Sequence, residues 1–120
     1  MKIEKVLELA KELNLDYEID NKDYYFYLPA EWVLNGENVE EDEREAFFVW
    51  DSKIKKVIAT FNIVVDADLN FYYNDSVDIS KFEDFEQRVR KMYNIITQLQ
   101  EMKKKLAVQM NLEKIKSDFN

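Results

Sequence analysis

The chain has no cysteine and no histidine, only one glycine and one proline, and no long hydrophobic run. Without cysteine there can be no disulfide, and without cysteine and histidine the usual zinc ligands and the commonest acid–base side chains are missing. A single glycine cannot build the glycine-rich loops that hold phosphate groups. These absences weigh against catalysis, and we expect a protein that is not an enzyme and binds no cofactor or metal.

A membrane span needs about 18 consecutive apolar residues, and no segment approaches that length. The first turns of the chain also lack the apolar stretch of a signal peptide, because Glu4, Glu8 and Glu12 interrupt them. The absence of cysteine fits a reducing compartment. The sequence therefore predicts a soluble, cytoplasmic protein.

Acidic and basic residues are unevenly divided along the 120 residues, whose formal net charge is −8. Residues 1–86 hold 22 acids and 9 bases, a net charge of −13, whereas residues 87–120 hold 3 acids and 8 bases, a net charge of +5. Binding to nucleic acid requires a basic surface that neutralises phosphates, so the acidic balance indicates no direct binding to nucleic acid. It favours a protein partner, one with a basic surface.

The length predicts one domain that spans residues 1–120, and a hydrophobic content of 47% with 14% aromatic residues is sufficient for its core. Helical periodicity predicts a helix over Lys2–Leu13 and a long one over about 81–117. Pro29 ends a strand, and Ala30–Leu34 is expected to make one helical turn before Asn35-Gly36. Alternating β-branched and aromatic residues predict strands at Tyr17–Ile19, Tyr24–Leu28, Glu45–Asp51, Lys56–Val65 and Asn70–Asn74. The expected fold class is α+β: an N-terminal helix, an antiparallel meander of three to five strands, and the long C-terminal helix packed on the sheet.

The C-terminal helix begins with the pattern of a capping box, in which Ser80 is the expected N-cap and Glu83 its partner. Its apolar residues then recur at alternating spacings of four and three, which predicts one buried face formed by Phe85, Val89, Met92, Ile96 and Leu99. A straight helix of this length is about 55 Å long, whereas a compact 120-residue domain has a radius of gyration of about 14 Å. Part of the helix must therefore project, bend back or pack against another chain, and we expect a homodimer through its outer half.

Two short patterns resemble metal sites only in part. Asp66 to Asn70 begins like a calcium-binding loop, but Phe71 and Val77 stand where that loop needs glycine and glutamate. Asp51-Ser52-Lys53 resembles the end of a metal-dependent nuclease motif, but the spacing is common and falls in a predicted hairpin loop. We interpret both as ordinary turns.

An acidic segment after the only glycine supplies the candidate partner-binding residues, together with the aromatic residue that precedes it. The candidates are Trp32, Glu37, Glu40, Glu41, Asp42 and Glu43. Carboxylates spread over one face can occupy the basic groove of a nucleic-acid-binding protein in place of phosphates. The alternative is a solvated connector, and the sequence does not separate the two.

Three hypotheses of function follow. The leading one is a small acidic protein that binds another protein as a stoichiometric inhibitor of a nuclease or nucleic-acid-binding partner. Nuclease-immunity proteins and phage inhibitors of host defence, such as anti-CRISPR proteins, are alike in size and acidity, although no motif matches a particular family. The alternative is a structural or assembly protein that dimerises through its C-terminal helix. An enzyme that uses only carboxylates and a metal ranks last.

Overall fold

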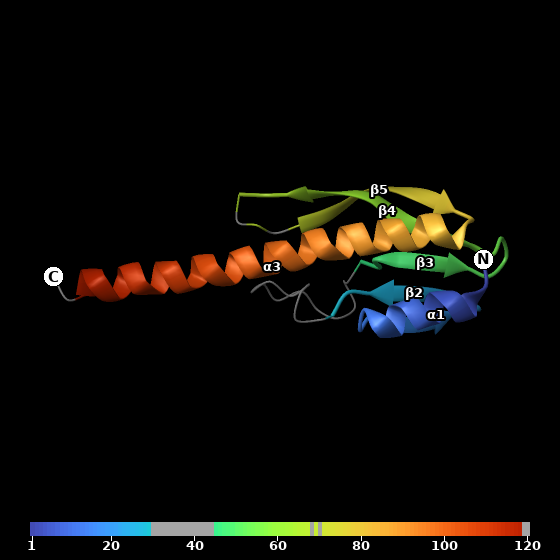
Figure 1. The fold of residues 1–120 in the computed structure, drawn as a ribbon, viewed down its shortest axis with the longest axis horizontal. Coiled ribbons are helices and arrows are strands. Elements are labelled where there is room, and N and C mark those ends of the chain that lie inside the picture. Colours follow the sequence, from blue (N-terminus) through green and yellow to red (C-terminus); the bar gives the residue numbers. More distant parts are fainter. Residues whose placement is uncertain (30–44, 68, 70, 119–120) are drawn as a thin grey trace.

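Five antiparallel strands form one sheet, and two helices lie on the same face of it (Figure 1). The structure is a computed structural model that describes residues 1–29, 45–67, 69 and 71–118. The described elements follow the chain as α1 (Ile3–Glu12), β1 (Asp16–Asp20), β2 (Asp23–Tyr27), β3 (Phe48–Asp51), β4 (Lys56–Val65), β5 (Phe71–Ile79) and α3 (Phe82–Asp118). The α+β class and the meander that the sequence predicts are confirmed.

Each strand pairs with its neighbour in the chain, so the sheet order is β1-β2-β3-β4-β5. Asn21 and Lys22 join β1 to β2, and both have left-handed backbone angles, with φ of 50° and 71°. Positive φ at both central residues is the requirement of a type I′ hairpin turn, whose twist matches that of the strands. The longest ladder joins β4 to β5, from Val57 opposite Ile79 to Val65 opposite Phe71.

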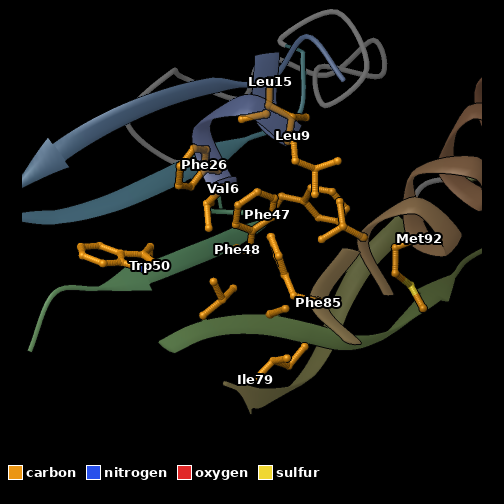
Figure 2. Close-up of a cluster of buried hydrophobic side chains, with 14 of the residues drawn as sticks. Val6, Leu9, Leu15, Phe26, Phe47, Phe48, Trp50, Ile79, Phe85 and Met92 are labelled. Carbon is orange, nitrogen blue, oxygen red and sulfur yellow. The ribbon is translucent and has the colours of Figure 1, made fainter. Parts of the chain in front are cut away.

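The hydrophobic core lies between the sheet and the two helices, and it is rich in aromatic rings (Figure 2). Phe26, Phe48 and Phe85 form its centre: the Phe26 and Phe48 rings stack with centroids 4.6 Å apart, and Phe85 meets Phe48 edge-on at 4.8 Å. All three side chains are 1% exposed or less. Since Phe85 comes from α3 and the other two come from β2 and β3, this cluster fixes the helix on the middle of the sheet.

The predicted buried face of α3 is confirmed. Phe85, Val89, Met92, Ile96 and Leu99 are all buried, with exposed fractions between 0% and 9%. Farther along α3, Met102, Leu106 and Val108 are 52–60% exposed. The second half of the helix therefore projects from the sheet, as Figure 1 shows, and the molecule measures 64 × 27 × 25 Å. We call the part up to Leu99 the head and residues 100–118 the tail.

Several predicted boundaries shift. The first helix is one residue shorter at each end, and β3 begins at Phe48, three residues later than expected. β5 continues to Ile79, five residues beyond the expected end, because pairing with β4 extends past the poor strand formers Asp75, Ser76 and Asp78. The first hydrogen bond of α3 runs from the Phe85 N–H to the Lys81 carbonyl, so the N-cap is Lys81 and the prediction of Ser80 is wrong by one residue.

Two other predictions fall on residues that the structure does not describe. The helical turn over Ala30–Leu34 lies wholly outside the described residues. Asp68 and Asn70 of the calcium-like pattern also lie outside them, although the Leu69 N–H donates to the Asp66 carbonyl at 3.1 Å, as in a turn. Asp51 does close the β3–β4 hairpin, since one of its carboxylate oxygens accepts from the Lys53 and Ile54 N–H groups at 2.9 and 3.3 Å.

Candidate functional site

The candidate partner-binding residues of the sequence cannot be placed. Trp32, Glu37, Glu40, Glu41, Asp42 and Glu43 all lie in residues 30–44, outside the described residues. That segment contains six acids and one base. The described chain does fix where it leaves and rejoins the sheet. It leaves just after Tyr27, at the end of β2, and the chain returns where the Phe47 N–H donates to the Phe26 carbonyl at 2.7 Å.

The edge strand β1, which pairs with β2, carries a row of carboxylates. Asp16, Glu18 and Asp20 alternate along it, and every residue of the strand is exposed. Tyr17 pairs with Phe26, a core residue, so the alternation of strand side chains turns the three acids to the sheet face that neither described helix covers. Successive acids are about 6.8 Å apart, twice the rise per residue of an antiparallel strand.

The row of carboxylates begins next to the point where the chain leaves the sheet for the acidic segment, residues 30–44. Asp16 lies opposite Tyr27 in the β1–β2 register, and Tyr27 is the last residue of β2 before the chain enters residues 30–44. The β1–β2 hairpin therefore places the first acid of β1 beside the last residue of β2, three positions before segment 30–44 begins. We refer to the three acids of β1 as the acidic edge.

Other carboxylates of the head hold the fold together. Asp23 Oδ1 accepts from the Ser52 N–H at 2.8 Å and from the Ser52 hydroxyl at 3.0 Å, which ties the β1–β2 turn to the β3–β4 hairpin. These two hydrogen bonds hold the pKa of the Asp23 carboxyl below its ordinary value, because they stabilise the ionised form.

Glu12 and Arg90 form the corresponding link between the helices. The Arg90 guanidinium donates to both Glu12 carboxylate oxygens, at 3.2 and 2.8 Å, and to Glu86 at 3.3 Å. The hydrogen bond from Arg90 lowers the pKa of Glu12. This bidentate pair ties α1 to α3, and we assign it a structural role.

A groove of about 830 Å³ lies on another side of the head, between α3 and the sheet edge at β5. Its described lining from the sheet side comprises Asn62, Val77, Asp78, Ile79 and Ser80. From α3 it comprises Asp84, Gln87, Arg88, Lys91, Met92 and Ile95. No sequence motif marks this groove, because its residues come from three elements and have individually common types.

The described residues contain no cluster of three or more acidic side chains placed to hold a metal ion. Within the same residues, no helix combines the length and apolar content of a membrane span. Comparison with protein-family models, curated proteins and solved structures finds no match, so function has to be inferred from the chain's own residues.

Proposed function

We propose that this chain is a small acidic protein-binding protein that acts as a stoichiometric inhibitor of a nuclease or another nucleic-acid-binding protein. The observation that supports this most is the acidic edge, a row of exposed carboxylates on β1. Asp16, the first of them, lies opposite Tyr27, after which the chain leaves the sheet for the acidic segment 30–44. Because the two acidic stretches begin beside each other, we propose that the partner contacts both of them, including Glu37, Glu40, Glu41, Asp42 and Glu43.

A carboxylate row on a strand is suited to such a role. The sheet backbone fixes the spacing of the acids, so binding requires little ordering of the inhibitor. A basic groove that binds DNA meets one phosphate per 3.4 Å along each strand. Carboxylates at about 6.8 Å supply half of that charge density.

The test begins with a pull-down from the host lysate, with the purified chain as bait and duplex DNA as competitor. We expect the retained protein to bind nucleic acid and to be released by the DNA, since both ligands would occupy one groove. A retained protein that DNA does not displace would overturn the proposal.

Association kinetics with the retained protein then locate the surface. Changing Glu40, Glu41 and Glu43 to Gln and Asp42 to Asn should slow association and weaken its salt dependence, because steering between exposed charges is screened with a Debye length of about 8 Å at physiological salt. Glu18→Gln with Asp20→Asn should act in the same direction. Trp32→Ala should act mainly on dissociation if that ring is a buried anchor.

A matched control removes two acids elsewhere. Glu4→Gln with Glu8→Gln changes the same number of charges on the exposed surface of α1 and should affect association much less. If the control slows association as much as the pair on the acidic edge, only net charge matters, and the proposed surface is wrong. If neither the four-acid variant nor the edge pair slows association at low salt, phosphate mimicry is wrong.

A second candidate function, assembly through α3, is favoured by the projecting tail. Met102, Leu106 and Val108 are each at least half exposed there, and a second copy could cover them. Light scattering at micromolar concentration should then give twice the chain mass of 14.5 kDa. Leu106→Lys should return the mass to that of one chain, whereas Gln109→Lys, an equal charge change on an exposed neighbour, should not. A parent protein with a mass of 14.5 kDa would exclude this function.

A further inference from the structure

The groove between α3 and β5 is bounded on one side by an edge strand of the sheet. β5 is the last strand of the sheet, and within the described residues it pairs only with β4. In an antiparallel sheet, alternate residues of an edge strand direct their N–H and C=O groups away from the sheet. These groups can pair with a further extended chain, which would then lie along the groove.

Asp75 limits the part of β5 with which a further strand could pair. Its φ of 54° is left-handed, so the backbone of β5 turns there, although the register with β4 is the same before and after it, from Asn62 opposite Asn74 to Thr60 opposite Ser76. Ser76–Ile79 is the part of β5 beyond this turn. The groove follows the second part, where Val77, Asp78 and Ile79 contribute to the lining. An added chain would therefore pair over about four residues.

The other wall is the side of α3 that faces away from α1 (Figure 1). Asp84 lies at the end of the groove that the β5–α3 connection closes, Arg88 and Lys91 follow one turn and two turns later, and Ile95 lies farthest along. Met92 is buried beneath this wall and Ile95 is half-buried, so the open end has an apolar lining. The helix wall thus changes along its length from acidic through basic to apolar, while the sheet side of the groove adds the side chains of Asp78 and Asn62.

The length of the helix wall agrees with that of a short extended chain. From Asp84 to Ile95 the helix rises about 16 Å, at 1.5 Å per residue. Five residues of an extended chain span about 17 Å, and their alternate side chains point the same way at intervals of about 6.8 Å. Three alternate side chains of such a chain would therefore meet the acidic, basic and apolar regions of the helix in turn. The groove volume of about 830 Å³ lies within the range of about 300–1,000 Å³ that is usual for ligand sites.

We propose that this groove binds an extended segment of another protein, which pairs with the Ser76–Ile79 edge of β5 and presents a basic, an acidic and an apolar side chain at alternate positions. The basic side chain meets Asp84, the acidic one meets Arg88 and Lys91, and the apolar one lies against Met92 and Ile95. Backbone pairing supplies affinity, and the order of the three side chains supplies specificity. This site is separate from the acidic edge, which lies on the opposite edge strand of the sheet, and it does not depend on the proposed inhibitor function.

Synthetic peptides test the proposal directly. The probes are Ser-Lys-Thr-Glu-Thr-Leu-Ser and its reverse Ser-Leu-Thr-Glu-Thr-Lys-Ser, because the strand could run in either direction, and threonine favours the extended conformation. The control exchanges the charges, as Ser-Glu-Thr-Lys-Thr-Leu-Ser. Binding is followed by NMR, through the amide shifts of the isotope-labelled full chain. We expect one of the two probes to shift residues 76–79 and 84–95, and the control to bind more weakly.

Two matched variants examine the helix wall. Lys91→Glu should weaken binding of the better probe by about three- to tenfold, since exposed ion pairs contribute up to about 1 kcal/mol and the reversal also adds repulsion. Lys104→Glu makes the same change on an exposed residue of the tail and should leave binding unchanged. Absence of shifts in the groove at about 1 mM of either probe would overturn the proposal. Equal effects of the two variants, or equal shifts along β1, would also overturn it, because binding would then lack the specificity of the groove.

Discussion

Phe85 offers the sharpest test of how the head is held together. Its side chain is fully buried, and it joins α3 to the sheet through an edge-on contact with Phe48 at 4.8 Å. Replacing a buried phenylalanine with alanine lowers the free energy of unfolding by about 3–5 kcal/mol, through lost apolar transfer and a residual cavity. The ring contact adds about 0.5–1.5 kcal/mol beyond burial, so we expect Phe85→Ala to lie in the upper half of that range.

Phe82→Ala is the matched control on the same helix. Phe82 packs at the margin of the core and its ring lies 6.1 Å from that of Phe85, but it is only half-buried. Its removal opens no closed cavity, and we expect a loss of about 1–2 kcal/mol. The two substitutions delete identical atoms, so the difference between them reports the deeper burial of Phe85 together with its ring contact to Phe48.

Urea unfolding followed by tryptophan fluorescence measures both losses, since Trp50 is buried in the same core. With an m-value of about 1.5 kcal/mol per molar urea, a loss of 4 kcal/mol, about the middle of the range, lowers the midpoint by about 2.5 M. The free energy of unfolding of a domain of this size is about 5–15 kcal/mol in total, so a protein at the lower end of that range would not fold with Phe85→Ala. Phe85→Leu, with an expected loss of about 1–2 kcal/mol, then serves as the measurable variant. A loss from Phe85→Ala no greater than that from Phe82→Ala would refute the assignment of Phe85 to the centre of the core.

Two further predictions concern the carboxylates that hold the fold. The folded-state pKa of Asp23 is lowered, so its contribution to stability is present above the unfolded value of about 4 and is lost as the pH falls below it. Asp23→Asn keeps an acceptor for Ser52 and should lose less stability between neutral pH and about pH 3 than the parent does, whereas identical pH profiles would contradict the assignment. Arg90→Ala should lower the midpoint of urea unfolding only slightly, because both partners of the Glu12 pair are substantially exposed, and a large shift would show that packing by its aliphatic stem dominates.

The sequence predicted the parts of the fold in which burial sets a strict period. The spacing from Phe85 to Leu99 identified the buried face of α3, because a helix can bury only residues that recur on one side. The alternation in Tyr24–Tyr27 puts Phe26 on one face and Tyr25 and Tyr27 on the other without showing which face is the core, and the structure buries the Phe26 face. In α1, however, Leu9 is buried while Ile3 and Leu7 are only half-buried, since a short helix on a sheet buries a narrower stripe than its apolar content indicates.

The features that the sequence did not predict depend on contacts between residues distant in the chain. In the second half of β5, Val77 and Ile79 alternate with polar residues, but Asp75 and Ser76 interrupt the apolar pattern, and the ladder with β4 shows that the strand continues past them. The groove at α3 joins residues up to 33 positions apart, from Asn62 to Ile95, and no local pattern encodes it. The acidic edge is visible in the sequence as Asp16, Glu18 and Asp20, but its position beside the ends of segment 30–44 follows only from the β1–β2 register.

The division of α3 into a packed half and a projecting tail also has a consequence for how the helix melts. The tail backbone continues for 19 residues past Leu99, to Asp118, and a helix on its own must first form an unfavourable nucleus before it can extend. In this protein the packed half of α3 supplies the nucleus, so the tail becomes helical by adding one residue at a time to an existing helix. We therefore expect the tail to fray residue by residue from its C-terminal end, while the head unfolds in one cooperative step. Amide hydrogen exchange should slow progressively from Asp118 toward Ile96, and a partner that held the tail would abolish this gradient before it raised the stability of the head.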